Sequence, residues 1–317
     1  MIKILAQTSD DINGASSRLR SFYFFYHAEN YGLDIRRKLS LPNILACEML
    51  HLQKCYSPKY LLLSLFYRIC GKRVVFDIDD QVEKPSHYFA LIFMLKVASH
   101  VTTDTVKRLE YLTELSINKS KFFVVPDVLD FAPNVALSKT APVKRIPTYK
   151  GILWFGHRGN LISIKELLDS SEEHLEFPIT IATKIYDQDS LILQYKSINF
   201  IPWSIDITFN PTLPVRYCLL NHILDESSSA LYKSENKMVT AILSGLVPIV
   251  SNSPAYAELA RQLGAEQLVF QKMDDVFKII KSLDDKWIED FLIRANLFVI
   301  NRYSSNKILK DFVKTIV

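Results

Sequence analysis

The segment Y-K-S-E-N-K at residues 232–237 combines a serine, an asparagine and two lysines where a helix is expected to begin. Ser234 can cap a helix over 235–244, whose first turn leaves backbone N–H groups unbonded at the positive end of the helix dipole. Lys233 and Lys237 add positive charge at the same end. This pattern is typical of a phosphate-binding helix start. A serine cap on a solvated helix is the alternative interpretation.

The segment W-F-G-H-R-G-N at 154–160 directly follows an expected strand at 152–155. Gly156 permits a tight turn from strand to helix and a close approach of the backbone to a ligand. His157 and Arg158 offer hydrogen-bond donors to a diphosphate. Alternatively, the glycine serves only the geometry of the turn and the arginine is solvated.

The segment F-D-I-D-D at 76–80 places three carboxylates at the end of an expected strand. Alternation along a strand puts Asp77 and Asp79 on one face, with Asp80 on the other face or in the turn. Two neighbouring carboxylates suit a general base, a metal site or the binding of hydroxyl groups. The alternative is structural: one carboxylate caps the next segment and another pairs with a buried arginine.

The segment N-G-A-S-S-R-L-R at 13–20 follows the first expected strand. Gly14 indicates a turn, and Arg18 and Arg20 fall in the opening turns of a helix, where the helix dipole opposes positive charge. An anion is therefore expected nearby, either a substrate phosphate or carboxylate, or one of the two aspartates just upstream. Because Arg18 lies nearer the turn, we expect it to face the ligand, and we expect Arg20 to form an ion pair at the domain surface.

Short apolar strands alternate with helical patterns along the whole chain, which predicts parallel sheets covered on both faces. In the first half we expect strands at 2–7, 47–53, 73–78, 100–102 and 122–126, and helices at 16–31, 57–70, 87–99 and 104–116. In the second half we expect strands at 152–155, 179–183, 199–201, 216–221, 247–251 and 267–270, and helices at 161–175, 235–244, 255–263 and 273–282.

These elements divide into two doubly wound domains. The predicted boundaries are 1–135 for the first domain, 136–150 for a linker rich in proline and basic residues, 151–290 for the second domain, and 291–317 for terminal helices that pack back on the first.

Composition agrees with a cytoplasmic globular protein. The 317 residues are 49% hydrophobic, enough for two cores, and the net charge of +4 comes without the basic and aromatic pattern of nucleic-acid binding. The four cysteines show no CxxC spacing, so a structural zinc site is not expected. The longest apolar runs reach about a dozen residues, below the roughly 20 that cross a bilayer, and predict buried helices or surface anchors.

Six motifs resemble, in chain order, the group 1 nucleotide-sugar glycosyltransferases of the GT-B fold. They are N-G-A-S-S-R-L-R, R-V-V-F-D-I-D-D, V-T-T-D-T, V-V-P-D-V-L-D, I-L-W-F-G and K-S-E-N-K-M-V-T-A-I-L-S-G-L-V-P-I-V-S-N-S-P-A-Y-A-E-L. The resemblance touches most of the chain, and the last motif is its most specific element. It implies an α/β architecture of two Rossmann-like doubly wound domains facing a central cleft. The second domain would hold the nucleotide-sugar donor and the first the acceptor.

The resemblance also implies roles for single residues. Donor-binding residues are expected at Gly156, His157, Arg158, Lys233, Ser234, Asn236, Lys237, Tyr256 and Glu258. Acceptor-binding residues are expected at Gly14, Ser17 and Arg18, and a base for an inverting reaction at Asp79 or Asp80. Neither a metal nor a cofactor is expected besides the nucleotide-sugar co-substrate, because lysine and arginine would neutralise the diphosphate.

The sequence departs from the family's pattern at several places, of which two positions bear on catalysis. Many members carry a pair of glutamates where this chain has Tyr232 and Thr240, so a catalytically silent sugar-nucleotide or glycan-binding protein is an alternative. A weaker alternative is a D-x-D phosphatase, because V-V-F-D-I-D-D-Q-V is similar to the motif that opens such domains. Here two strands precede it.

The expected function is therefore that of a transferase in surface polysaccharide biosynthesis. It would move a sugar from a nucleotide-sugar donor to a glycan or lipid-linked acceptor at the inner face of the membrane, with peripheral contact through apolar helices of the first domain and no nucleic-acid partner.

Overall fold

The computed structural model describes the chain except for Gln81, Glu83, Lys84, Ile117, 131–144, Pro147, 170–175, 186–193, Lys196, 225–228 and Val317. It divides into two compact units. Unit 1 comprises Met1–Asp130, Tyr232–Ser234 and Arg302–Val317, and unit 2 comprises Phe131–Leu231 and Glu235–Asn301.

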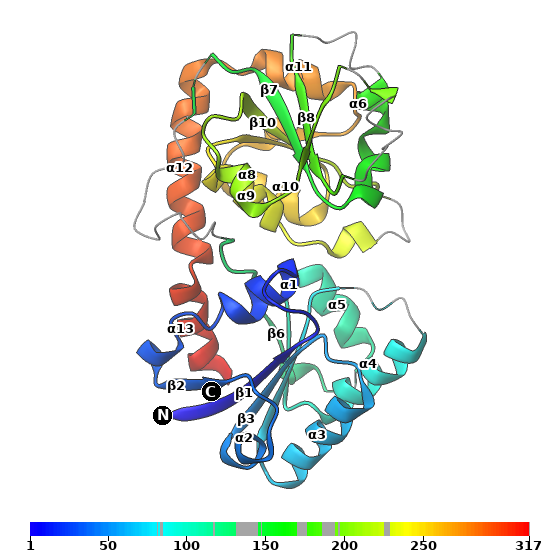
Figure 1. Ribbon diagram of the computed structural model, residues 1–317, viewed down its shortest axis with the longest axis vertical. Coiled ribbons are helices and arrows are strands. Elements are labelled where there is room, and N and C mark those ends of the chain that lie inside the picture. Colours follow the sequence, from blue (N-terminus) through cyan, green and yellow to red (C-terminus); the bar gives the residue numbers. More distant parts are fainter. Residues whose placement is uncertain are drawn as a thin grey trace. The chain divides into compact units, whose positions relative to one another are not determined.

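Unit 1 is built on a parallel six-stranded sheet with the order β2-β1-β3-β4-β5-β6 (Figure 1). Its strands are β1 (Ile2–Thr8), β2 (Leu33–Arg36), β3 (Met49–Gln53), β4 (Arg73–Ile78), β5 (His100–Thr103) and β6 (Phe122–Val124). Every residue of β3 is buried, as expected of a parallel sheet covered on both faces.

Nine helical segments lie wholly within unit 1 in the described part of the chain. They are α1 (Ala15–Ser17), η1 (Arg18–Phe22), η2 (Ala28–Tyr31), α2 (Leu41–Ala46), α3 (Pro58–Ile69), α4 (Pro85–Val97), α5 (Val106–Glu114), η3 (Lys119–Lys121) and α13 (Ser305–Ile316). Pro58 occupies the first turn of α3, where a missing N–H costs no hydrogen bond. Thr105 caps α5 by accepting a hydrogen bond from the Arg108 amide at 3.2 Å.

Unit 2 contains a second parallel six-stranded sheet, with the order β12-β11-β10-β7-β8-β9. Its strands are β7 (Gly151–Phe155), β8 (Ile179–Thr183), β9 (Asn199–Pro202), β10 (Val215–Leu220), β11 (Val247–Ser251) and β12 (Val269–Phe270). Its helical segments are η4 (Arg158–Ile164), α6 (Lys165–Asp169), α8 (Ile205–Phe209), α9 (Asn236–Leu243), α10 (Pro254–Gln262), η7 (Glu266–Leu268) and α11 (Asp275–Ser282). Two segments cross the division between the units, η6 (Ser229–Tyr232) and α12 (Asp285–Tyr303).

Arg145 stabilises unit 2 from within the stretch that the sequence predicted as a linker. Its guanidinium is buried and donates to the carbonyls of Thr208, Asn210 and Ser244 at 2.5, 3.0 and 2.8 Å. The first and last of these carbonyls lie at the ends of α8 and α9, where backbone acceptors lack helical partners. Burial lowers the pKa of Arg145 to about 10, so the guanidinium stays charged at neutral pH.

The α/β prediction of two doubly wound sheets is confirmed, and the strands expected at 73–78, 179–183 and 247–251 have the predicted bounds. The single helix expected at 16–31 is wrong, because α1 runs directly into η1, and turns at residues 23–27 then separate η1 from η2. The sequence analysis also missed β2 and α2, which lie between two expected elements. Part of the expected helix at 161–175 and most of the expected linker at 136–150 lie outside the described residues.

Candidate functional site

The chain reverses its direction of winding between β7 and β10 of unit 2. From β7 it proceeds through β8 to β9 on one side, and from β10 it proceeds through β11 to β12 on the other. Helices that follow the two strands therefore diverge, which leaves a crevice at the carboxyl ends of the strands where doubly wound sheets bind ligands. Phe155 and Leu220 end the two strands at this point.

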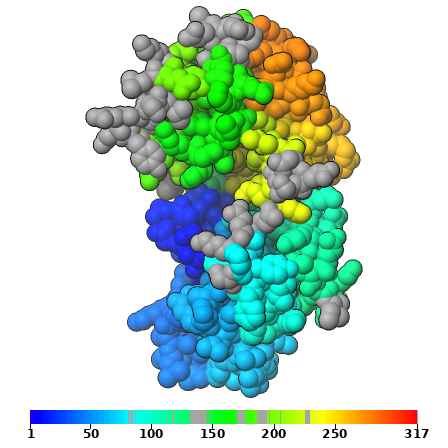
Figure 2. Space-filling model, turned by 90° about the vertical axis from the view of Figure 1, so that its right-hand side faces the viewer, coloured from blue at the N-terminus to red at the C-terminus, as the bar shows by residue number. Residues whose placement is uncertain are grey.

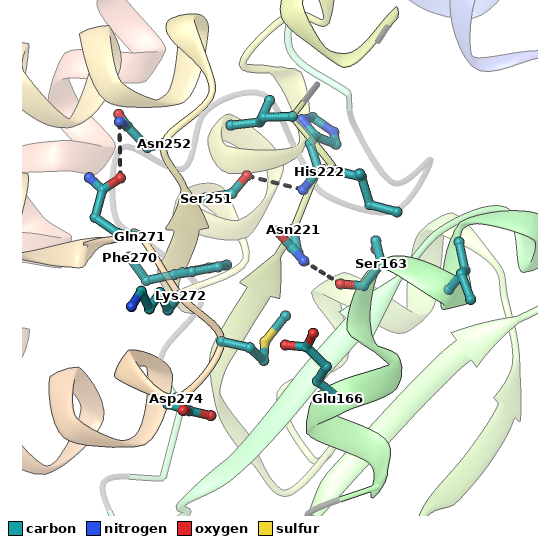
Figure 3. Close-up of a pocket in the computed structure, with 14 residues that line it drawn as sticks. Ser163, Glu166, Asn221, His222, Ser251, Asn252, Phe270, Gln271, Lys272 and Asp274 are labelled. Carbon is teal, nitrogen blue, oxygen red and sulfur yellow. Dashed lines mark hydrogen bonds between the residues drawn. The ribbon is translucent and has the colours of Figure 1, made fainter. Parts of the chain in front are cut away.

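A cavity of about 750 Å³ opens next to this point, entirely within unit 2. Its wall comes from η4, α6 and the segments that follow β10, β11 and β12 (Figure 3). In Figure 3 the side chains of Glu166, Asn221 and Phe270 turn toward the same space. The volume falls within the range of small-molecule sites in proteins.

Hydrogen bonds between neighbouring loops hold the cavity wall in place. The Asn221 side chain donates to the Ser163 carbonyl, which ties the end of β10 to η4. The His222 amide donates to the Ser251 hydroxyl at 3.0 Å, which ties the same segment to the end of β11 (Figure 3). The wall therefore joins segments that are separate in sequence.

The His222 ring stacks on Tyr256, with the ring centres 5.0 Å apart and the planes at 14°. Tyr256 itself is buried, with 1% of its surface exposed, and it does not line the cavity. Of the predicted donor residues, Tyr256 thus supports the wall from behind, through a histidine that the sequence analysis did not select.

The cavity offers a mixed set of polar groups and one aromatic surface. Glu166, Lys272 and Asp274 supply charges, amides and hydroxyls come from loops after the strands, and Phe270 supplies a flat apolar ring. Carboxylates and amides bind hydroxyl groups and the edges of heterocyclic bases, and an aromatic ring can stack on a base. This chemistry fits a nucleoside or a sugar.

Lys237 and Gly156 lie together at the carboxyl end of β7. The Lys237 ammonium donates to the Phe155 carbonyl at 3.3 Å and lies 5.9 Å from the centre of the Trp154 ring. A Cβ atom added to Gly156 would come within 2.9 Å of the Lys237 ammonium. The Lys237 ammonium therefore lies directly beside Gly156, and the structure brings these two predicted donor residues together.

His157 and Arg158 begin the segment η4 that follows β7. His157 is exposed, and its Nδ1 accepts a hydrogen bond from the Gly159 amide at 3.2 Å, so its ring caps the turn. Arg158 is half-buried and reaches the Lys184 carbonyl at 3.5 Å. Both residues lie near the crevice, but neither lines the cavity.

The prediction that Ser234 caps α9 is wrong. Glu235 occupies the cap position, and the helix begins at Asn236. The Ser234 hydroxyl instead donates to Asp127 at 2.7 Å, and the Lys233 ammonium lies 3.1 Å from Asp80. Residues 232–234 belong to unit 1, where Asp127 and Asp80 bind the Ser234 and Lys233 side chains.

The remaining predicted donor residue, Glu258, lies on the exposed side of α10. Its carboxylate accepts hydrogen bonds from Arg261 at 2.7 and 3.0 Å and from Gln262 at 2.6 Å. The predicted donor set is therefore divided. Gly156, Asn236 and Lys237 belong to unit 2 near the crevice, while Lys233 and Ser234 belong to unit 1.

Buried charges occupy the corresponding edge of the sheet in unit 1. Arg20 is 3% exposed and binds both oxygens of Asp77 at 2.7 and 2.6 Å, and it also reaches Asp127 at 2.9 Å. The Thr102 hydroxyl donates to the same Asp77 at 2.5 Å. Burial raises the pKa of Asp77, but Arg20 outweighs it and holds that pKa below the usual value. Arg20 is therefore a core residue, and the expectation of an ion pair at the surface is wrong.

Asp79 and Asp80 have different surroundings, although they are adjacent. Burial raises the pKa of Asp79, whose carboxylate accepts a hydrogen bond from Gln53 at 3.1 Å and lies 3.8 Å from the Lys54 ammonium. Asp80 contacts Lys54 and lies 3.1 Å from Lys233, and these two cations outweigh burial and lower its pKa. At neutral pH Asp79 is the stronger base of the two.

The predicted acceptor residues surround the end of β1. Ser17 is fully buried, accepts a hydrogen bond from the Asp10 amide at 3.2 Å and donates to Gln53 at 3.3 Å. Gly14 packs against Asp10, because an added Cβ would lie 2.8 Å from the Asp10 Cβ. Arg18 is 6% exposed and binds both oxygens of Asp130 at 2.7 Å. The anion expected near Arg18 is thus Asp130, not the upstream aspartates.

The sequence analysis missed the residues that line the cavity. Asn221, Ser251 and Asn252 stand at the ends of two strands whose bounds were expected within a residue or two. The same rule that selected residues after β1, β4 and β7 points to these positions. Phe270 and Gln271 follow a two-residue strand, which gave a weaker signal.

Within the described part of the chain, no group of three or more His, Cys, Asp or Glu side chains is arranged to hold a metal ion. Among the same residues, none of the helices combines the length and the apolar character needed to cross a membrane.

No model of a protein family matches the sequence, and a search of the curated proteins finds no match. Solved structures do match. HepE of Anabaena in complex with UDP has a TM-score of 0.65 at 12% identity, covering 100% of this chain and 99% of that one. Sucrose-phosphate synthase of Thermosynechococcus elongatus has a TM-score of 0.66 at 11% identity, over 99% of this chain and 98% of that one.

A glycosyltransferase of Rickettsia africae also has a TM-score of 0.66, at 12% identity over 99% of this chain and 97% of that one. The chain has the GT-B glycosyltransferase fold. Because the similarity covers both units, the fold extends over the full length of the sequence and not over one Rossmann-like unit alone.

Proposed function

We propose that this protein is a glycosyltransferase that moves a sugar from a nucleotide-sugar donor to a glycan or lipid-linked acceptor in surface polysaccharide biosynthesis. The observation that carries the proposal is the cavity of about 750 Å³ at the carboxyl edge of the unit 2 sheet, beside the reversal between β7 and β10. Proteins of the same fold are known with UDP and with UDP-glucose, which supports this class of donor.

In this proposal the nucleoside lies in the cavity and the diphosphate lies toward Lys237. Phe270, Asn221 and Gln271 supply an aromatic ring and amide groups to the nucleoside. Gly156 leaves room beside the Lys237 ammonium for a phosphate oxygen to approach. Cleavage of the bond between the sugar and the phosphate leaves negative charge on the diphosphate, which Lys237 and Arg158 stabilise as it departs.

Unit 1 would supply the base if the reaction inverts the anomeric centre. Of the two candidates, Asp79 fits better, because its raised pKa makes it a stronger proton acceptor than Asp80. Asp80 is engaged by Lys54 and Lys233 and fits a role in placing this loop. A retaining reaction needs no such base, and Asp79→Asn would then leave transfer largely intact.

Donor binding is tested by thermal shift against UDP-, GDP-, CMP- and dTDP-sugars. A donor at 100 times its dissociation constant adds about 2.7 kcal/mol to the free energy of unfolding, which raises the midpoint clearly. The Asn252→Trp variant should abolish the shift by filling the cavity, whereas Asn301→Trp, on the exposed side of α12, should keep it. If none of the four donors shifts the midpoint, the proposal fails.

Transfer is separated from silent binding by measuring donor hydrolysis with and without EDTA. Tyr232 and Thr240 carry no carboxylate, so neither position can supply the contact that a glutamate would make to the donor. Thr240 is also buried inside α9, and the Tyr232 carbonyl accepts a hydrogen bond from Arg108. We expect slow hydrolysis that survives EDTA, because lysine and arginine neutralise the diphosphate. Binding without hydrolysis or transfer would favour the silent binder.

The D-x-D phosphatase alternative receives no support from the geometry. The carboxylate that would be phosphorylated, Asp77, is 2% exposed, and both of its oxygens are bound by Arg20. A nucleophile must reach its substrate, and here the guanidinium occupies that direction.

A further inference from the structure

Helices α3 and α4 share one face of unit 1. The chain steps from β3 to β4 to β5 in the same direction across the sheet, so right-handed crossovers place both helices on the same side. The two helices contact each other, and Figure 2 looks onto this side, where α3 in blue adjoins α4 in cyan. Their outward side chains therefore form one surface.

This α3–α4 face is apolar and exposed. On α3 the outward residues recur at i, i+3, i+4 and i+7, which is one face of a helix, and on α4 two aromatic residues are exposed. They are Leu62, Leu65, Phe66 and Ile69 with Tyr88 and Phe89. Leu62, Ile69 and Phe89 are 69%, 77% and 70% exposed. Contiguous apolar surface of this kind on a globular protein marks an interaction site.

The same stretch of chain carries basic residues and lacks acidic ones. Residues 49–76 and 85–103 contain neither aspartate nor glutamate. Lys59 and Arg68 on α3 and Lys96 on α4 are exposed. The apolar face therefore has a positive rim.

The rim is strongest at the end of α3. Burial lowers the pKa of His100, and the positive charges of Arg73, Arg68 and Lys121 lie close enough to lower it further. Lys121 itself donates to the carbonyls of Leu95 and Ala98 at the end of α4. Positive charge thus gathers where both helices end.

We propose that the α3–α4 face docks unit 1 on an anionic lipid bilayer, with Leu62, Ile69 and Phe89 entering the interface and Lys59, Arg68 and Lys96 contacting the headgroups. Apolar residues flanked by lysine and arginine, with aromatic rings at the boundary, are the composition of surfaces that lie on membranes without crossing them. Anionic lipid attracts such a rim through its surface potential.

Charge argues against a second copy of this chain as the occupant. In a two-fold dimer the same patch faces itself, so the basic rim of one copy would meet the basic rim of the other. Like charges across an interface oppose association. An anionic lipid surface instead complements the rim along its whole length.

The test is co-sedimentation of the full chain with vesicles of phosphatidylcholine mixed with phosphatidylglycerol, and with vesicles of phosphatidylcholine alone. We expect binding to the anionic vesicles that weakens with salt and is at least about tenfold weaker without phosphatidylglycerol. The Leu62→Glu/Ile69→Glu variant should bind anionic vesicles at least about tenfold more weakly, because charges replace two residues that enter the interface.

The matched control is Ile293→Glu/Leu297→Glu, which places two glutamates on exposed apolar positions of α12, 48% and 45% exposed in the parent. It should bind vesicles like the parent. Lys59→Glu/Arg68→Glu should lose at least about fivefold at low salt while keeping the apolar residues. The proposal is overturned by absence of vesicle binding at low salt, or by equal binding of Leu62→Glu/Ile69→Glu. It is also overturned if sedimentation velocity shows that the parent protein forms dimers and that Leu62→Glu/Ile69→Glu is monomeric.

Discussion

The two units carry the same kind of sheet, but the reversal points of the two sheets differ. In unit 1 the chain reverses between β1 and β3, and at the carboxyl ends of these strands the Ser9 and Ser17 hydroxyls both donate to the Gln53 side-chain oxygen, at 3.5 and 3.3 Å. In unit 2 the reversal between β7 and β10 borders a cavity of about 750 Å³.

The difference shows which polar groups serve architecture and which remain available to a ligand. At the edge of the unit 1 sheet, Arg18 and Arg20 each bind both oxygens of an aspartate and are almost completely buried. A buried charge that already has its partner cannot bind a substrate without leaving that partner unpaired. In unit 2 the side chains around the cavity are supported by loop hydrogen bonds, and a ligand could enter.

The largest effect is expected from Arg20→Met. The substitution removes the guanidinium that binds Asp77 and leaves a buried carboxylate without its counter-charge. The free energy of unfolding should fall by about 3–5 kcal/mol, as when one partner of a buried pair is lost. Urea denaturation at neutral pH measures it. Arg36→Ala, which breaks an exposed pair with Asp34, is the matched control and should hardly move the midpoint.

If Arg20→Met lowered the free energy of unfolding by less than about 1 kcal/mol, the architectural interpretation of the unit 1 edge would be wrong.

A smaller effect, on binding and not on folding, is expected from Lys237→Ala in unit 2. Loss of one charge-assisted contact to the diphosphate should weaken nucleotide-sugar binding by about 1.5–3 kcal/mol. The fold should stay intact, because the substitution leaves the buried residues of α9 unchanged. Isothermal titration measures the affinity. Unchanged affinity would place the diphosphate elsewhere.

Features that depend on residues close together in the sequence could be predicted, and contacts between residues far apart in the sequence could not. Strand bounds depend mainly on neighbouring residues, and the strands at 73–78, 179–183 and 247–251 were predicted with their observed bounds. The partners of Arg18 and Arg20 were not predictable in the same way. Asp130 and Asp77 stand 112 and 57 positions away, and only the folded sheet brings them to the arginines.

The donor motif shows the same limit at shorter range. The pattern K-S-E-N-K predicted a capped helix from local preference, but Asp127 of unit 1 binds the Ser234 hydroxyl, and Glu235 takes the cap position without capping the helix through its side chain. A hydroxyl can satisfy a helix amide or a carboxylate. The choice between them depends on a residue more than 100 positions upstream.

An effect of about 2 kcal/mol is expected from the titration of His51, which lies beside the buried charges of unit 1. Burial among aromatic rings lowers the pKa of His51 to about 4, with Arg20 and Arg37 acting in the same direction and Asp77 opposing them. The unfolded chain binds this proton near pH 6.5, so the stabilisation is complete above pH 6.5 and is lost as the pH falls toward 4. Between pH 7.5 and 5 the loss is about 2 kcal/mol.

The comparison uses His51→Phe, which keeps a ring against Phe25 and Phe312 and removes the proton site. The parent should lose about 2 kcal/mol more than this variant between the two pH values, measured by urea denaturation. Asp104 acts with the opposite sign, because burial raises its pKa to about 7 against the effect of Arg108, but it is present in both proteins and cancels. Equal pH dependence would show that His51 is not buried in the neutral form.

The smallest effect on folding is expected from Lys233→Ala, and it sharpens the contrast between the two lysines of the donor motif. Lys233 and Asp80 form an ion pair at 3.1 Å with about half of each side chain exposed, 45% and 41%. Such pairs contribute at most about 0.5 kcal/mol, because solvent screens them. Asp80 also keeps Lys54 as a partner after the substitution. Urea denaturation should therefore barely distinguish the variant from the parent.

Donor affinity should fall at least threefold less in Lys233→Ala than in Lys237→Ala, which is a difference of roughly 0.7 kcal/mol in binding free energy. The reason is that Lys233 must leave a carboxylate before it can bind a phosphate. Titration of both variants with the same nucleotide sugar decides the matter: equal losses of affinity would mean that the ion pair with Asp80 does not withhold Lys233 from the donor.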